Sequence, residues 1–177
     1  MARGGYKVIV KGFPYFTTSS IVDWMPVFRH PECVQTVLDS LRFLRDQHAL
    51  RLHAYVVMED HLHLLVSSQD VSSTLQRFLS HTARKIAGIC QDNDMTNMSE
   101  VFRTHCGQSP RRQHQVWQRG FHPKVILSHQ MLVQKIEYIH LNPVKKGLVA
   151  VAADWPYSSL AYLNGDNSLP RVDPVAL

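Results

Sequence analysis

Residues 55–68 read YVVMEDHLHLLVSS, and two histidines, His61 and His63, interrupt this otherwise largely apolar stretch. Successive side chains of a β-strand point to opposite faces, so a strand here places both histidines on one face. The other face then carries an apolar row: Leu62, Leu64 and Val66. Burying each of these side chains contributes roughly 1.5–3 kcal/mol. The stretch therefore predicts a strand with one core face and a pair of imidazoles on the reverse.

The histidine pair admits more than one interpretation. Two imidazoles at positions i and i+2 can converge on one metal ion, because each offers a ring-nitrogen lone pair. With eleven histidines in the chain, such a pair also arises by chance. A closed zinc site needs further ligands, and the candidates His53, His81 and Cys106 do not fall at recognised zinc spacing. We therefore expect no closed structural zinc site.

The sequence around the pair predicts alternating strands and helices. Strands are expected at residues 6–13, 50–58 and 61–67, and helices at 31–48, 72–90 and 129–141. Residues 14–28 indicate an irregular connection or a second short strand, residues 91–100 a polar loop, and residues 115–126 a short strand, a turn and a return. Pro143 should end or distort the last helix, because the residue before a proline avoids the α region. This order predicts an α+β fold, an antiparallel sheet with packed helices.

Length and composition suit one domain over residues 1–177, with residues 155–177 as a C-terminal tail that wraps it, anchored by Trp155 and Tyr157. No apolar run approaches the length of a membrane span, and the N-terminus lacks the features of a secretory signal. The three cysteines form no CxxC pair, which favours reduced thiols. We expect a cytoplasmic protein.

The net charge of +5 and the pI of about 9.3 point to an anionic partner, with nucleic acid the leading candidate. A modestly basic protein without such a partner is the competing interpretation. The candidates for phosphate contacts are Arg77, Arg84, Lys85, Arg111, Arg112, Arg119, Lys124, Lys145 and Lys146. Trp117 and Phe121 are candidates to stack on unpaired bases, or equally to pack in the core.

A second stretch, EYIHLNPVKKGLV at residues 137–149, places Tyr138 four residues before Asn142. On a helix the two side chains share a face. Taken alone, the pair is explained by a packed aromatic ring and a polar residue near the helix end.

Four motifs occur in order: YVVMEDHLHLLV, WQRGFHPKVI, YIHLNPVKKGLV and DWPYSS. Together they resemble the REP-associated tyrosine transposases, a branch of the single-tyrosine HUH transposases, over about residues 6–163. The resemblance implies a ferredoxin-like α+β fold. It also implies a metal-dependent endonuclease and strand-transferase that acts on single-stranded DNA next to palindromic hairpins, through a 5′-phosphotyrosine intermediate.

The resemblance further implies a role for each matching residue. His61 and His63 would be metal ligands, Asn142 would supply a third ligand and Tyr138 would be the nucleophile. The metal would be Mg²⁺ or Mn²⁺, and the partner would be single-stranded or hairpin DNA.

The chain departs from the family pattern at two places. Glu59 and Asp60 stand where the family often has Pro-Asn; their carboxylates could be oxygen ligands or plain turn residues. Pro123 stands where the family often has an aspartate, which removes a possible carboxylate beside the site and puts a role for His122 in doubt.

Two other hypotheses stay open on the sequence. One is a catalytically silent hairpin-DNA-binding module derived from such a transposase. The other is a metal-dependent hydrolase of a different class, in which Tyr138 lies far from His61 and His63. Both a monomer and a homodimer are compatible with the sequence.

Overall fold

The computed structural model describes residues 12–106, 113–120 and 123–175. In chain order the elements are β1 (Tyr15–Ser20), the 3₁₀ turns η1 (Val22–Trp24) and η2 (Val27–Arg29), α1 (Pro31–Asp46), β2 (Arg51–Val57), β3 (His61–Ser67), α2 (Val71–Asp92), α3 (Thr96–Thr104), β4 (Lys124–Val125), α4 (His129–Lys145), η3 (Ala152–Asp154) and α5 (Ser159–Leu163).

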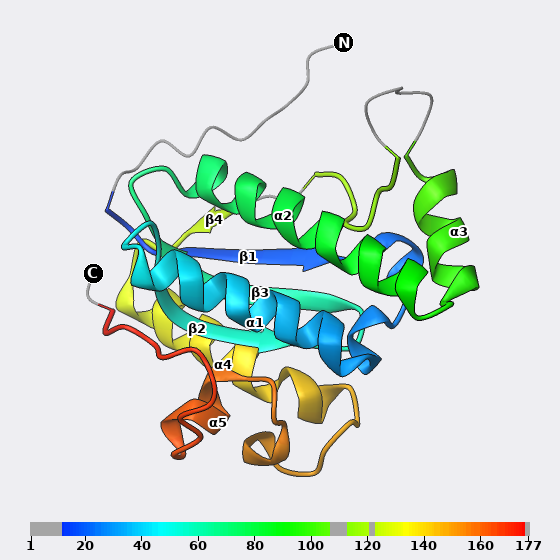
Figure 1. The fold of residues 1–177 in the computed structure, drawn as a ribbon. Helices are drawn as coiled ribbons and strands as arrows, with labels where there is room; N and C mark the ends of the chain where they lie inside the picture. The colour runs from blue at the N-terminus through cyan, green and yellow to red at the C-terminus, as the bar shows by residue number, and fades with distance from the viewer. Residues whose placement is uncertain (1–11, 107–112, 121–122, 176–177) are drawn as a thin grey trace.

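The strands form one four-stranded sheet in the order β2-β3-β1-β4, and each neighbouring pair is antiparallel. Helix α1 connects β1 to β2, the β2–β3 hairpin follows, and α2 and α3 lead to β4 (Figure 1). This is the β-α-β-β-α-β order of the ferredoxin-like folds. The predicted fold class, a ferredoxin-like antiparallel sheet with packed helices, is therefore confirmed.

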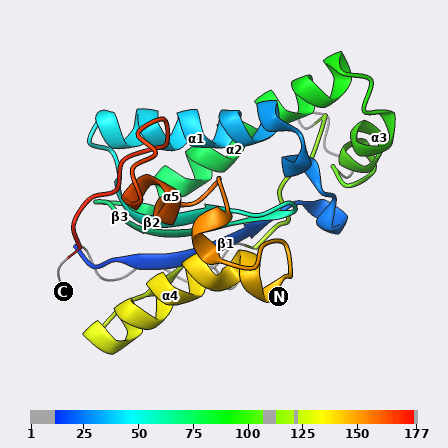
Figure 2. The ribbon, with the colours of Figure 1, turned by 90° about the horizontal axis from the view of Figure 1, so that it is seen from below.

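The helices divide between the two faces of the sheet. Figure 2 shows α1 and α2 on one face and α4 on the other. The apolar row of β3 lies in the core beneath α1 and α2, whereas Leu65 belongs to a smaller cluster with Phe16, Val56 and Ile139 on the α4 side. Strand alternation thus separates the side chains of β3 as the sequence predicts.

Backbone hydrogen bonds hold both Glu59 and Asp60, the residues of the turn between β2 and β3. Met58 N–H donates to the His61 carbonyl at 2.8 Å and closes the hairpin. The carbonyls of Glu59 and Asp60 accept from the backbone N–H groups of Phe28 and Ile21, at 2.9 and 2.8 Å. These bonds fix where β3 begins, and hence where His61 lies.

Helix α4 begins at a side-chain cap, because Ser128 Oγ accepts from Met131 N–H at 3.2 Å. The helix continues through Pro143 to Lys145, so of the two expected effects of Pro143, an end of the helix or a distortion of its last turn, the first is wrong. A proline removes one helical N–H, and here that loss falls in the last turn. Lys146 N–H still bonds to the Asn142 carbonyl at 3.1 Å.

Two other predictions need correction. Residues 6–11 of the first expected strand lie outside the described residues and residues 12–13 are not in a strand, whereas β1 lies in the stretch expected to be irregular or a short strand. β1 escapes a simple pattern because polar side chains are buried in it: Thr17 is 2% exposed. Residues 91–100 are no loop, since α2 ends at Asp92 and α3 begins at Thr96, with Phe102 in the core.

The residues that follow α4 pack along β2, the edge of the sheet. Trp155 Nε1–H donates to the Val57 carbonyl and Val57 N–H donates to the Tyr157 carbonyl, both at 2.9 Å. Further on, the Asp173 carboxylate accepts from Leu52 N–H at 3.1 Å. Both predicted aromatic anchors therefore lie against this strand.

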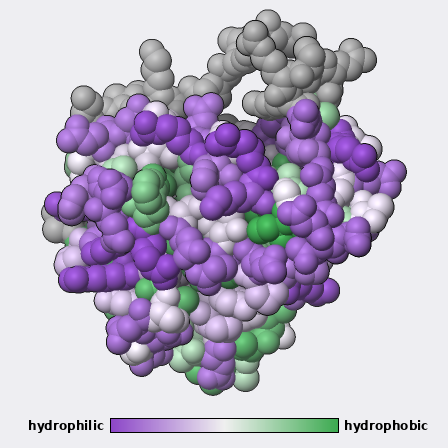
Figure 3. All heavy atoms as spheres, viewed as in Figure 1, coloured by the Kyte–Doolittle hydropathy of each residue, from purple (hydrophilic) through white to green (hydrophobic). Residues whose placement is uncertain are grey.

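The outer surface of α1 and α2 is mostly hydrophilic, with small hydrophobic patches between charged side chains (Figure 3). Within the described ranges, no helix combines the length and the apolar character needed to cross a bilayer.

Candidate active site

His61 and His63 lie on the α4 face of β3, with ring centroids 4.7 Å apart. Strand pairing places Ser20 opposite His61 and Thr18 opposite His63. Thr18 Oγ1 is 2.8 Å from His63 Nδ1. This cross-strand bond fixes the ring of His63 and directs its Nε2 toward α4.

Asp60 fixes the other histidine. Its carboxylate pairs with His61 Nδ1. A carboxylate on one ring nitrogen sets the tautomer and orients the other nitrogen, as it commonly does for metal-binding histidines. Within the described part of the chain, His61 Nε2 has no hydrogen-bond partner and is free to act as a ligand.

Burial keeps His63 uncharged. Desolvation, with smaller contributions from the charges of His61 and Lys135, lowers the pKa of His63 from its ordinary value near 6.5 to about 3. Its ring is therefore neutral at physiological pH, the form that binds metal ions.

Tyr138 reaches the same place from α4. Its ring centroid lies 5.1 Å from that of His63 and 5.8 Å from that of Phe16, both in edge-on geometry, and the side chain is half-buried. The structure thus brings Tyr138 to the histidine face. This placement contradicts the hypothesis of a hydrolase in which Tyr138 lies far from the two histidines.

Asn142, one turn beyond Tyr138, is 5% exposed and completes the cluster. Its Nδ2 lies 3.2 Å from His63 Nε2, so Nδ2–H donates to that nitrogen and the His63 proton sits on Nδ1. Its Oδ1 is buried and has no hydrogen-bond partner. A buried polar atom without a partner calls for an explanation, and an amide oxygen in a side chain that contacts His63 suits a divalent cation.

The other sequence candidates for metal binding do not join this cluster. His53 bonds to Ser67 Oγ at 2.9 Å and to the Asp173 carbonyl at 3.1 Å, at the far end of the hairpin. His81 is exposed on α2, and Cys106 follows α3. Residues 12–106, 113–120 and 123–175 contain no group of three or more His, Cys, Asp or Glu side chains that could hold a metal. Within these ranges, Asn142 is a candidate of another residue type for a third ligand beside the two histidines.

Glu59 and Asp60, which depart from the family pattern, have separate partners. The Glu59 carboxylate pairs with the Arg29 guanidinium at 2.8 and 3.1 Å near the surface. Both residues form the turn, and Asp60 in addition bonds His61. The other departure from the family pattern is Pro123, which is half-buried just before β4. His122 lies outside the described residues.

Among the predicted phosphate contacts that lie in the described ranges, Lys145 alone is brought to Tyr138, with Nζ 5.3 Å from the ring centroid. Lys146 is exposed just after α4. Arg84 and Lys85 are exposed on α2, on the opposite face of the sheet, as is Arg77.

The remaining DNA-binding candidates lie elsewhere. Arg119 and Lys124 are exposed near β4, and Arg119 Nε–H donates to Gln115 Oε1 at 2.8 Å. Trp117 belongs to the core: it packs on Phe28 and its Nε1–H donates to Thr82 Oγ1 at 3.1 Å. Arg111, Arg112 and Phe121 lie outside the described residues.

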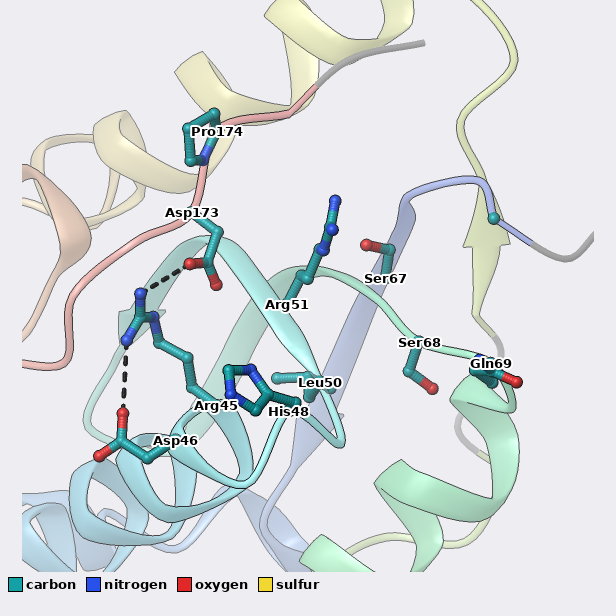
Figure 4. Close-up of a pocket in the computed structure, with 11 residues that line it drawn as sticks. Arg45, Asp46, His48, Leu50, Arg51, Ser67, Ser68, Gln69, Asp173 and Pro174 are labelled. Atoms are coloured by element: carbon teal, nitrogen blue, oxygen red, sulfur yellow. Dashed lines mark hydrogen bonds and ion pairs between the residues drawn. The ribbon is translucent and has the colours of Figure 1, made fainter.

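A cavity of about 1040 Å³ lies away from this cluster, where β2 begins and β3 ends (Figure 4). Arg45 pairs there with Asp46 and Asp173, at 3.3 and 2.7 Å. Arg51 points into the opening, and no dashed line joins it to a neighbour (Figure 4). None of the groups of the histidine cluster lines this cavity.

The sequence patterns do not indicate two residues of the cluster, and they leave the role of a third residue undecided. Thr18 and Lys135 were not singled out, although Lys135 lies three residues before Tyr138 and so shares its helix face. Asp60 was noted, but its bond to His61 depends on the turn. Thr18 depends on strand register, which no local pattern reveals.

No protein-family model matches the chain. A curated protein of Haemophilus influenzae, named "Putative REP-associated tyrosine transposase", is 30% identical over 106 residues. The match covers 60% of this chain and 56% of that protein, little more than half of the relative's length. The solved structure of a REP-associated tyrosine transposase bound to a REP hairpin superposes with a TM-score of 0.62 at 19% identity, covering 100% of this chain and 93% of that one.

The chain therefore has the fold of a tyrosine transposase. The sequence match is to a protein named for the REP-associated tyrosine transposases, so both comparisons agree with the resemblance that the four motifs indicate.

Proposed function

We propose that the chain is a metal-dependent single-strand DNA endonuclease and strand-transferase that acts next to palindromic hairpins. One observation carries the proposal: the Tyr138 ring lies 5.1 Å from His63, beside an Asn142 Oδ1 that is buried and unpartnered. A tyrosine, two imidazoles and an amide oxygen together suit phosphodiester chemistry. The hairpin as substrate rests on the relative that was solved with a REP hairpin.

Three groups would hold the metal: Nε2 of His61, Nε2 of His63 and Oδ1 of Asn142. When bound, Mg²⁺ or Mn²⁺ would supply positive charge beside the phosphate oxygens. Asp60 and Thr18 hold the two rings in place through their Nδ1 atoms. The two rings are thus held in place before substrate arrives, whereas the Asn142 amide, which donates to His63 Nε2 in this structure, would have to turn for Nε2 and Oδ1 to bind the metal.

Tyr138 acts as the nucleophile in this proposal. Its phenol oxygen forms a bond to phosphorus and loses its proton to solvent, while the bond from phosphorus to the 3′ oxygen breaks and that oxygen gains a proton. The products are a 5′-phosphotyrosine and a free 3′-hydroxyl. Because the phosphotyrosine keeps the ester bond energy, attack by another 3′-hydroxyl rejoins the strands without ATP.

The test is formation of a covalent protein–DNA adduct on hairpin DNA with a single-stranded flank, in Mg²⁺ or Mn²⁺. Wild type should form the adduct, whereas Tyr138→Phe should form none and still bind the DNA. Tyr162→Phe, which removes a hydroxyl from the half-buried tyrosine of α5, is the matched control and should form the adduct normally. An adduct in Tyr138→Phe would reject this nucleophile. Hairpin binding without any adduct, across titrations of both metals, would instead support a silent DNA-binding module.

A further inference from the structure

Two lysines on α4 lie on either side of Tyr138. Lys135, Tyr138, Asn142 and Lys145 are spaced by three, four and three residues, which places all four on one stripe of the helix. This stripe faces Phe16 and the histidine pair, because the rings of Tyr138, Phe16 and His63 are in contact. Each end of the stripe therefore carries a positive charge.

Ring contacts hold both ammonium groups near the phenol. Lys135 Nζ lies 4.7 Å from the Phe16 ring centroid and 5.4 Å from that of Tyr138. Lys145 Nζ lies 5.3 Å from the Tyr138 centroid. Cation–π contacts at such sites contribute roughly 0.5–1 kcal/mol each. The contacts direct two flexible side chains toward the tyrosine rather than into open solvent.

Among the described residues, neither lysine has a carboxylate partner. In the described part of the chain, no ion pair includes Lys135 or Lys145. Asp60, the carboxylate of the cluster, is already paired with His61. Two cations beside a proposed nucleophile, with no anion to balance them, leave room for a polyanion.

We propose that Lys135 and Lys145 bind backbone phosphates of a single DNA strand on either side of the one that Tyr138 attacks. Their Cα atoms are separated by roughly 15 Å along the helix, enough to reach more than one phosphate. The ammonium groups bind non-bridging oxygens and transfer no proton. The strand is thereby drawn across the phenol, in register with the ligand face of β3. This inference rests on the proposed function, because it describes how the DNA strand would cross the proposed active site.

The test is the salt dependence of binding of a short single-stranded oligonucleotide, measured by fluorescence anisotropy in EDTA. Each phosphate contact adds about 0.7 to the slope of log K against log salt for single strands. Lys135→Gln and Lys145→Gln should each lower the slope by about 0.7, and the double variant by about 1.4. Lys→Arg at either position should restore it, because the charge is kept.

Arg51→Gln is the matched control for loss of one positive charge. Arg51 is exposed and pairs with Ser67, at the end of β3 opposite to His61 and roughly 20 Å from it. The slope of log K against log salt for Arg51→Gln should equal that of wild type. The proposal is overturned if the lysine variants keep the wild-type slope, or lose no more than Arg51→Gln loses. Should Lys135→Gln fail to fold, Lys145→Gln, which is exposed, still decides the question.

The same variants separate this inference from the proposed function. Binding is measured without metal and without cleavage, so the slopes can fall as expected even if wild type never forms an adduct. That result would support the phosphate contacts and reject the proposed nuclease activity. If wild type forms the adduct but the slopes are unchanged, the phosphate contacts are rejected and the nuclease stands.

Discussion

The two faces of β3 differ sharply although they belong to one strand. Toward α1 and α2 it presents Leu62, Leu64 and Val66, each at most 1% exposed and surrounded by apolar side chains. Toward α4 it presents His61 and His63 together with Leu65, and His63 contacts the amide of Asn142, whose Oδ1 is unpartnered. The β3 side chains of the first face are all apolar, whereas two of those on the second face are imidazoles.

This difference indicates a division of labour. Apolar burial contributes roughly 1.5–3 kcal/mol for each side chain, so the α1/α2 face accounts for much of the stability of the hairpin. A buried polar atom without a partner costs about 1–3 kcal/mol, so the α4 face gives up stability. Groups that a fold keeps at such a cost are candidates for binding or catalysis. The comparison predicts that substitutions on the two faces have opposite consequences.

The largest expected contrast is between neighbours on β3. Leu64→Ala should lower the free energy of unfolding by about 2–5 kcal/mol, because it leaves a cavity in the core, yet keep adduct formation per folded molecule. His63→Gln should lower adduct formation below detection, because it removes a proposed metal ligand, with a smaller loss of stability. Urea unfolding and the adduct assay, run on both variants, measure the contrast. Equal losses of stability and of activity in the two variants would contradict the claim that the two faces have different roles.

A smaller contrast is expected within the turn before β3. Asp60→Asn should weaken Mn²⁺ binding 10–100-fold, because the amide supports the His61 ring less well than the carboxylate does. Isothermal titration calorimetry measures this affinity without DNA. Glu59→Gln is the matched control: it breaks only a pair with Arg29 near the surface and should bind Mn²⁺ as wild type does. Equal Mn²⁺ affinities for wild type and Asp60→Asn would show that Asp60 does not support the ligand.

The last expected effect is a pH dependence of stability, which involves no substitution. Burial lowers the pKa of His53, and that of His63 to about 3, whereas an unfolded histidine titrates near pH 6.5. Their contribution to stability is therefore present above about pH 6.5 and is lost as the pH falls, by at most about 1.4 kcal/mol per pH unit for each group.

Urea unfolding between pH 7.5 and 5, in EDTA, measures this slope. His53→Gln and His63→Gln should each reduce it. A wild-type stability that stays constant as the pH falls would contradict the neutral, buried state of both rings.

Much of the fold could be predicted from sequence because its periodicity is local. α1, α2 and the β2–β3 hairpin carry clear helical or alternating patterns, and the structure has them close to the expected bounds. β1 and α3 could not be placed in this way. β1 buries Thr17 and Ser19, which look like surface residues, and α3 follows a polar stretch and packs through Phe102, beyond the window taken for a loop.

The candidate site divides in the same way. Alternation along β3 suffices to place His61 and His63 together, and helical spacing suffices to pair Tyr138 with Asn142. What joins the two pairs is the packing of α4 on the sheet, which the family resemblance implied and no local pattern contains. Thr18 depends on strand register, and the contacts of Lys135 depend on how α4 meets β1.

The most direct measurement of the central claim is the site of covalent attachment. Wild-type protein would be incubated with hairpin DNA carrying a single-stranded flank and Mn²⁺, then digested with nuclease and protease for mass spectrometry. We predict that the modified peptide carries a 5′-phosphonucleotide on Tyr138. Attachment at any other residue, or no attachment in protein that binds the hairpin, would contradict the account.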